Sequence, residues 1–132
     1  ELGTAAAWTT SALALAEPGR RVLSWDVEVH PQREATLALL PPDVRARVEL
    51  HARPGGTGPH PPPPLDALFL DSSHEREETA ESFRLFAAAL PPGGVVAFHD
   101  FADPDYPGVM EAIDELGLTG RAAGHVFVWR KP

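Results

Sequence analysis

The sequence predicts an α/β fold in which a mostly parallel β-sheet carries helices on both of its faces. Segments that favour helix and segments that favour strand alternate along nearly the whole chain, which is the pattern of successive βαβ units. The 132 residues provide enough material for one core, so we expect residues 1–132 to form a single domain. Crossovers between the parallel strands should then be right-handed.

The first half of the chain predicts two helices and two strands. An Ala- and Leu-rich segment favours helix and is ended by Pro18 and Gly19. Pro31 suits the first turn of the second helix. The four elements are expected at residues 5–17 (helix), 21–27 (strand), 32–40 (helix) and 48–51 (strand).

A segment rich in proline and glycine, residues 53–64, separates the two halves. Proline has no backbone N–H, so this segment cannot join a helix or a sheet. The strands on either side are too few for two separate cores. We therefore interpret the segment as a loop inserted within one domain rather than as a linker.

The second half predicts three strands and two amphipathic helices. Ser72 and Glu75 have the spacing of a capping box, which would start a helix near His74. Gly117 closes the last helix. The strands are expected at residues 65–70, 94–98 and 126–129, and the apolar helix faces at Ala80, Phe83, Ala87 and Leu90 and at Val109, Ala112, Ile113 and Leu116.

Composition and charge exclude several classes of function. The formal net charge is -8, and no basic stripe is present of the kind that binds a phosphate backbone, so nucleic acid is not an expected partner. No apolar run approaches the roughly 20 residues that span a bilayer. The absence of cysteine and of a secretion signal is typical of a cytoplasmic protein. A homo-oligomer is compatible with all of these observations.

Polar side chains follow two of the predicted strands at the points where those strands end. Asp71 and His74 follow residues 65–70, and His99 and Asp100 follow residues 94–98. The carboxyl ends of parallel strands form one edge of the sheet, where ligands bind. We therefore expect these four side chains to form a cluster able to bind a divalent metal and to move a proton.

Each of these residues also has a purely structural interpretation. Asp71 would serve equally well as a helix cap, and His74 stands in a charged, solvated helical turn. His99 and Asp100 could simply form a turn. Asp26, at the end of the strand at residues 21–27, either binds a ribose diol or faces water.

The order of these motifs resembles the class I S-adenosylmethionine-dependent methyltransferases, which have a Rossmann-like fold. Residues 1–4, Glu-Leu-Gly-Thr, resemble their glycine-rich first motif, and Asp26 stands at the position of their ribose-binding acid. Residues 68–74 and 90–100 are similar to the motifs of their fourth and fifth strands. Within that superfamily, the chain most resembles small-molecule O-methyltransferases of the macrocin and cephalosporin-hydroxylase type.

The resemblance implies an enzyme that transfers a methyl group from S-adenosylmethionine to a hydroxyl of a small molecule. It implies that Glu1, Gly3, Thr4 and Asp26 bind the cofactor. It also implies a divalent metal, Mg²⁺ or Mn²⁺, with His74 as the general base. The implied metal ligands are Asp71, His99 and Asp100. The imidazole of His99 would shift the preference toward Mn²⁺, Fe²⁺ or Zn²⁺.

The chain departs from the family pattern at the cofactor end. Ala5 and Ala7 occupy positions where relatives carry glycine, and the first, central strand would have to precede Glu1. We therefore expect a sheet that lacks its first strand. One alternative is a non-catalytic remnant of the fold that acts as a binding or structural module. A nicotinamide-dependent dehydrogenase is disfavoured, because residues 3–8 lack two of the three glycines of its fingerprint.

Overall fold

The structure is a computed structural model that describes residues 1–53 and 62–132. The chain divides into two compact units, Glu1–Gly55 and Gly56–Pro132, and each is described by itself. Most of the predicted loop at residues 53–64 lies outside the described residues. The organisation of residues 1–132 as a single domain stays a prediction.

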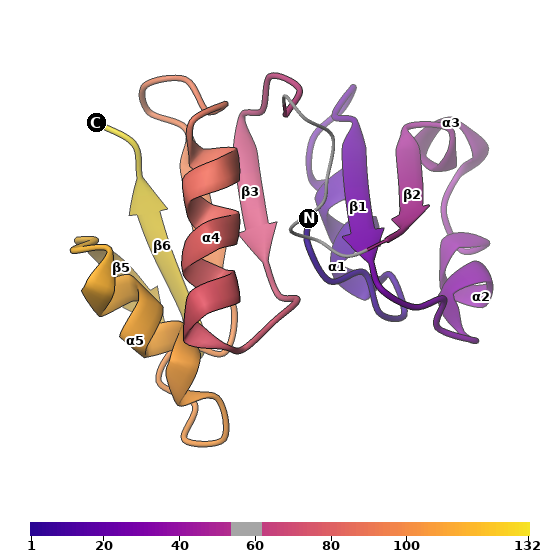
Figure 1. The fold of residues 1–132 in the computed structure, drawn as a ribbon. Helices are drawn as coiled ribbons and strands as arrows, with labels where there is room; N and C mark the ends of the chain where they lie inside the picture. The colour runs from indigo at the N-terminus through magenta and orange to yellow at the C-terminus, as the bar shows by residue number, and fades with distance from the viewer. Residues whose placement is uncertain (54–61) are drawn as a thin grey trace. The chain divides into compact units, whose positions relative to one another are not determined.

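The first unit contains a parallel strand pair with helices (Figure 1). Strands β1 and β2 pair from Val22 opposite Val48 to Asp26 opposite Ala52. Buried apolar side chains of this unit form a core that includes Val22, Leu37 and Val48. Its elements are α1 (Trp8–Ala16), β1 (Val22–Asp26), α2 (Arg33–Leu37), α3 (Pro42–Arg45) and β2 (Val48–Ala52).

The residues before α1 lie along the free edge of β1. Leu2 forms an isolated parallel bridge with Trp25. The Gly3 N–H donates to the Trp25 carbonyl over 2.8 Å, and the Trp25 N–H donates to the Glu1 carbonyl over 3.1 Å. The opening residues therefore add a short third chain segment beside β1, at the position expected for the end of the first strand.

The second unit is a four-stranded mixed sheet with the order β3-β4-β6-β5. Strands β3 and β4 are parallel, whereas β6 is antiparallel to both β4 and β5. Figure 1 shows α4 and α5 side by side. The elements are β3 (Ala67–Leu70), α4 (Arg76–Ala87), β4 (Val95–Phe98), α5 (Pro107–Glu115), β5 (Gly120–Ala123) and β6 (Val126–Arg130).

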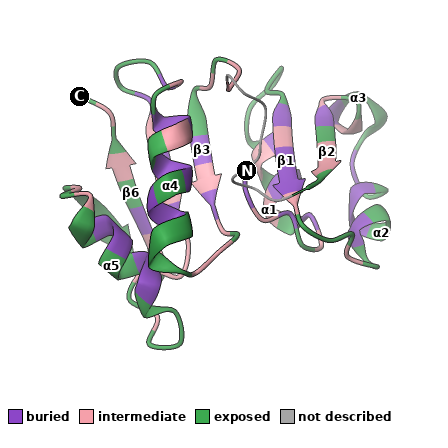
Figure 2. Cartoon of the chain, viewed as in Figure 1, coloured by how far each residue is buried: buried purple, intermediate pink, exposed green. Residues whose placement is uncertain are grey.

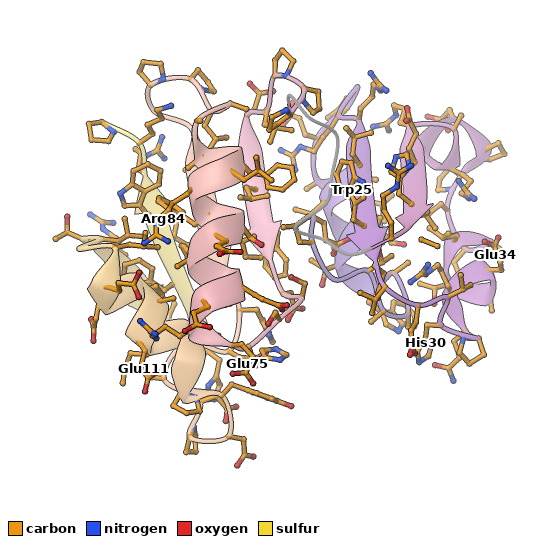
Figure 3. The ribbon with its side chains drawn as sticks, viewed as in Figure 1. Trp25, His30, Glu34, Glu75, Arg84 and Glu111 are labelled. Atoms are coloured by element: carbon orange, nitrogen blue, oxygen red, sulfur yellow. The ribbon has the colours of Figure 1, made fainter. Side chains whose placement is uncertain are left out.

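Helix α4 carries a buried stripe that packs into the core of the second unit (Figure 2). Phe83 and Phe86 lie on this stripe, and Phe83 stacks on Phe98 of β4 at a centroid distance of 5.8 Å. Arg84 lies on the solvent side of α4 (Figure 3). Its guanidinium is 2.7 Å from the carboxylate of Glu115 on α5. The amphipathic pattern expected for this helix is therefore confirmed.

Three local features differ from expectation. The first helix begins at Trp8 because Ala5 and Ala7 have positive φ angles of 42° and 64°. Helix α4 begins at Arg76 with Glu75 as a cap residue that makes no side-chain cap bond, so the predicted capping box is wrong. Helix α3 and strand β5 were not expected. Within the described residues, no helix is long and apolar enough to cross a membrane.

Candidate functional site

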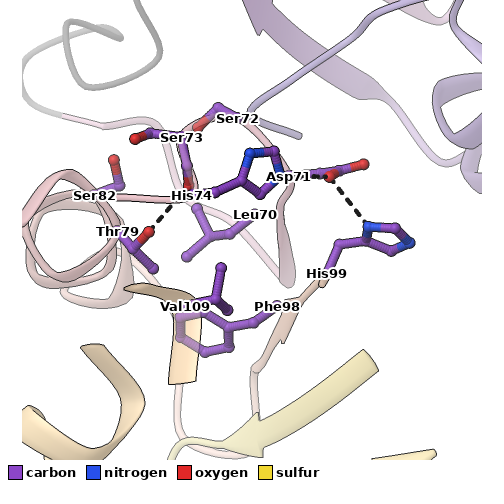
Figure 4. A pocket seen from close by; sticks show the side chains of 10 residues that line it. All are labelled: Leu70, Asp71, Ser72, Ser73, His74, Thr79, Ser82, Phe98, His99 and Val109. Carbon is purple, nitrogen blue, oxygen red and sulfur yellow. Dashed lines mark hydrogen bonds and ion pairs between the residues drawn. The ribbon is translucent and has the colours of Figure 1, made fainter. Parts of the chain in front are cut away.

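The carboxyl ends of β3 and β4 bring the predicted polar residues together. Leu70 pairs with Phe98 at the end of the parallel ladder, and the His99 N–H donates to the Leu70 carbonyl over 2.9 Å. Asp71 and His99 therefore leave the sheet at the same level. His99 Nδ1 lies 3.3 Å from Asp71 Oδ1 (Figure 4) and 3.0 Å from Asp100 Oδ2.

His74 reaches the same cluster from the loop between β3 and α4. Its Nε2 atom lies 2.8 Å from Asp100 Oδ2 and 3.9 Å from Asp71 Oδ1. Ligand atoms of Asp71, His74 and Asp100 all lie within 4.8 Å of one another. The structure therefore confirms that these side chains cluster, as predicted for Asp71, His74, His99 and Asp100. His74 is one of the three residues whose atoms are close enough to hold one ion.

Two buried ring nitrogens in this cluster lack hydrogen bonds of normal geometry. His74 Nε2 and His99 Nδ1 are both inaccessible to solvent, and neither makes a bond of acceptable angle despite the short distances to carboxylate oxygens. Adjacent ligands of an octahedral ion with bonds of about 2.1 Å lie about 3.0 Å apart. The nitrogen-to-oxygen distances of 2.8, 3.0 and 3.3 Å are close to that spacing, whereas the 3.9 Å between His74 Nε2 and Asp71 Oδ1 is longer. Among the described residues, the atoms placed to share one ion are those of Asp71, His74 and Asp100.

The charges of the cluster alter its proton affinities. Burial raises the pKa of the Asp71 carboxyl above its usual value, and Asp100 adds to this, while His99 and His74 oppose it. Burial alone would lower the pKa of His99, but the carboxylates of Asp100 and Asp71 outweigh it, so that its pKa is raised. A divalent cation would relieve the repulsion between the two carboxylates.

The start of helix α5 packs against His74. The Tyr106 ring stacks on the His74 ring with 3.9 Å between their centroids. Gly108 permits this approach, because a Cβ atom there would lie 2.3 Å from the His74 carbonyl oxygen. The sequence gave no periodic signal for this contact, because Tyr106 and Gly108 come directly after a loop.

The predicted cofactor residues lie in the first unit, around the turn that leads into α1. Gly3 has a φ of +96°, and Ala5 and Ala7 keep positive φ without being glycine. The Thr4 hydroxyl is buried and lies 2.6 Å from the Ser24 hydroxyl. The hydroxyl is therefore directed at β1. The role of Thr4 in binding the cofactor stays a prediction.

Two acidic side chains flank this turn. The Glu1 carboxylate is buried and accepts hydrogen bonds from the hydroxyls of Thr10 and Ser24. Asp26 ends β1, and its Oδ2 atom accepts the Ala5 N–H over 2.7 Å. Asp26 is therefore tied to the turn rather than simply facing water.

Arg33 is the residue of this region that sequence reasoning missed. Its side chain is 3% exposed and lies 3.2 Å from Asp26 Oδ2. It also donates to the Ala5 carbonyl over 3.1 Å. An arginine in a short polar helix gives no sign of burial in the sequence, because only the tertiary structure supplies its partners.

The Rossmann-like elements, the left-handed turn before α1 and the acid at the end of β1 define a protein of the class I S-adenosylmethionine-dependent methyltransferase superfamily. The chain belongs to the methyltransferase-domain family, whose model matches residues 1–101. The sequence-based assignment of class and of enzymatic function is therefore confirmed at this level. A comparison with curated proteins found no match.

Solved structures of methyltransferases share the fold over nearly the whole chain. CalS11, a TDP-rhamnose 3'-O-methyltransferase of calicheamicin biosynthesis, is 15% identical with a TM-score of 0.75, covering 98% of this chain and 69% of its own. TomG from Streptomyces achromogenes, an O-methyltransferase of tomaymycin synthesis solved with S-adenosylmethionine, is 20% identical with a TM-score of 0.68, covering 99% and 71%. A Burkholderia thailandensis 1,6-didemethyltoxoflavin N1-methyltransferase is 18% identical with a TM-score of 0.69, covering 98% and 69%.

Proposed function

We propose that this chain catalyses metal-assisted transfer of a methyl group from S-adenosylmethionine to a hydroxyl of a small molecule. The observation that carries the proposal is the convergence of two carboxylates and two imidazole nitrogens at the ends of β3 and β4. Such a donor set suits a divalent ion, and its imidazoles favour Mn²⁺ over Mg²⁺. We propose Asp71, His99 and Asp100 as the metal ligands.

The donor half of the proposal rests on the turn at the start of the chain. Positive φ at Gly3, Ala5 and Ala7 curls the backbone as glycine does in nucleotide-binding turns. Glu1, Gly3 and Thr4 would contribute through this turn. A carboxylate can accept about four hydrogen bonds, so Asp26 keeps the capacity to hold a ribose hydroxyl beside its bonds to the turn.

The reaction requires an acceptor oxygen that is aligned and deprotonated. A bond forms from that oxygen to the methyl carbon as the carbon–sulfur bond breaks, and the hydroxyl proton passes to a base. When bound, a divalent cation makes a nearby hydroxyl more acidic and orients it. His74 is the proposed base, since histidine accepts protons near neutral pH.

The position of the His74 Nε2 atom favours a second role for this residue. Its Nε2 atom is inaccessible to solvent and faces Asp100 and Asp71, which is the orientation of a metal ligand. A ligand and a base respond differently to substitution. Loss of a ligand weakens the binding of the ion, whereas loss of a base lowers turnover and leaves ion binding unchanged.

The acceptor class is proposed from the relatives that share the fold. The names of two of them specify TDP-rhamnose and 1,6-didemethyltoxoflavin as substrates, whereas a third is named an rRNA-methylase. The strongly acidic charge of the chain argues against a nucleic-acid acceptor. We therefore propose a small-molecule hydroxyl as the acceptor, in the manner of the macrocin and cephalosporin-hydroxylase type of enzyme.

Calorimetry tests both halves of the proposal. The full chain should bind S-adenosylhomocysteine, and Mn²⁺ should bind in a separate titration. Asp71→Asn and Asp100→Asn should weaken Mn²⁺ binding by roughly tenfold or more and leave binding of S-adenosylhomocysteine intact. Full Mn²⁺ affinity in both variants would refute the metal site.

Substitution of each histidine distinguishes their roles. His99→Gln should weaken Mn²⁺ binding if His99 is a ligand. His74→Gln should keep Mn²⁺ affinity if His74 is the base, and should lose it if His74 is a ligand. Failure of the unsubstituted chain to bind S-adenosylhomocysteine would favour the non-catalytic remnant.

A further inference from the structure

Arg33 is a buried charged side chain in the donor-side unit that the proposed chemistry does not use. Its side chain is 3% exposed. The Nε atom donates to the Ala5 carbonyl over 3.1 Å, and Nη2 donates to the Glu28 carbonyl over 2.8 Å. Nη2 also lies 3.2 Å from Asp26 Oδ2. One guanidinium thus joins the turn before α1 to the end of β1.

Ala5 needs such support because its backbone is in an unfavourable conformation. Its φ of 42° lies in the left-handed region, which costs a residue with a Cβ atom free energy that glycine does not lose. Its side chain is exposed, so packing does not hold it there. The holding contacts are polar: Asp26 accepts from the Ala5 N–H, and Arg33 donates to the Ala5 carbonyl.

These bonds form a closed ring. Asp26 fixes the amide of Ala5, Arg33 fixes its carbonyl, and the ion pair between Asp26 and Arg33 joins the two. The N–H and the carbonyl of Ala5 are therefore both held by side chains, which fixes the backbone on each side of its Cα atom. The same ring orients the Asp26 carboxylate.

We propose that Arg33 is a positioning residue for donor binding, which holds Ala5 in the conformation that glycine would adopt freely and holds Asp26 toward its ligand. The inference rests on the proposed function, since it assumes that the donor binds at this turn. It explains how alanine occupies a position where a glycine is expected. The planar fork of arginine suits the task, because Nε and Nη2 reach different carbonyls at once.

The test compares Arg33→Met with a matched control in the same unit. Arg47 also donates to backbone carbonyls, those of Asp43, Ala14 and Arg20, but none of them belongs to the turn. Calorimetry with S-adenosylhomocysteine and thermal unfolding are measured for both variants of the full chain. Arg33→Met should weaken binding by roughly tenfold or more, while Arg47→Met should lower stability and leave affinity within about twofold.

A second variant keeps the inference testable if Arg33→Met is poorly folded. Arg33→Lys retains the charge and loses the fork, so it should fold and still bind S-adenosylhomocysteine more weakly. The strongest readout is coupling to Ala5→Gly, because glycine adopts positive φ without support. In that background, Arg33→Lys should lose clearly less affinity than it loses in the parent chain.

Three outcomes would overturn the inference. Equal affinity losses in Arg33→Met and Arg47→Met would reduce Arg33 to a general structural role. Full affinity in Arg33→Lys would show that the fork is not needed. Equal losses with and without Ala5→Gly would show that Arg33 does not act through Ala5. In each case the unsubstituted chain still binds S-adenosylhomocysteine, whereas no binding at all would instead refute the proposed function.

Discussion

Gly108 is the position where one added methyl group should show how the polar cluster at the ends of β3 and β4 is supported. It is buried in the first turn of α5. A Cβ atom there would lie 2.3 Å from the His74 carbonyl oxygen and 2.7 Å from the Arg76 nitrogen. Real Cβ contacts essentially never fall below 3.0 Å, so Gly108→Ala must push α5 and the His74 loop apart.

The size of the effect follows from what must move. Both contacting atoms belong to the backbone, so no side chain can rotate away, and the cost should lie at the upper end of the overpacking range, about 3 kcal/mol. For a chain of this size that corresponds to a fall in Tm of about 10 °C. Because Tyr106 stacks on His74 two residues before Gly108, the substitution should also displace the His74 ring. Mn²⁺ affinity should then fall by roughly tenfold if His74 is a ligand, and methyl transfer should fall with Mn²⁺ affinity unchanged if His74 is the base.

Thermal unfolding and Mn²⁺ titration measure these effects, with Gly117→Ala as the matched control. Gly117 follows the same helix at a φ of +63° with nothing near its Cβ position. Its substitution should cost about 1 kcal/mol through backbone conformation alone and leave Mn²⁺ binding unchanged. An unchanged Tm in Gly108→Ala would refute the packing argument. A lowered Tm with both Mn²⁺ affinity and methyl transfer unchanged would refute the support of His74.

The remaining predictions concern pH, a helix terminus and the turn. Because the pKa values of His99 and Asp71 are raised and their protons compete with an ion, Mn²⁺ affinity measured by calorimetry should rise as pH increases from about 5.5 to about 8; a flat profile would contradict this. Lys131 Nζ donates to the carbonyls of residues 87, 88 and 90 at the end of α4, so Lys131→Met should cost about 1 kcal/mol in urea unfolding; an unchanged midpoint would contradict that role. Ala5→Gly should raise stability in the same assay by up to about 1 kcal/mol, and a loss would show that φ is not strained there.

The sequence was sufficient to predict the polar cluster at the ends of β3 and β4, because strand ends carry positional information. A strand followed at once by Asp71 and another followed by His99 and Asp100 must place these residues at one sheet edge if the strands are parallel neighbours. The ladder that ends at Leu70 and Phe98 meets that condition. Helix α4 was predicted for a different reason: its apolar residues recur at helical spacing, and that pattern can be recognised without knowledge of tertiary contacts.

Features that depend on tertiary partners could not be predicted. Strand β5 consists of Gly-Arg-Ala-Ala, which has little strand propensity and forms only because β6 pairs with it. The burial of Arg33 depends on three acceptors, all of which precede its own helix in the sequence. Such contacts cannot be predicted from local sequence. Strand β5 and the burial of Arg33 were therefore missed, because both depend on contacts with other segments of the chain.

The strained turn bears on the choice between an enzyme and a non-catalytic remnant. The sequence left open whether Ala5 and Ala7 still permit donor binding, and both keep the left-handed backbone that glycine would supply. Holding a residue with a Cβ atom in that conformation costs roughly 1 kcal/mol or more, and a purely structural module would become more stable if the turn relaxed. For Ala5, the ring formed with Arg33 and Asp26 instead preserves the turn. That arrangement favours a chain that still uses the turn to bind its donor.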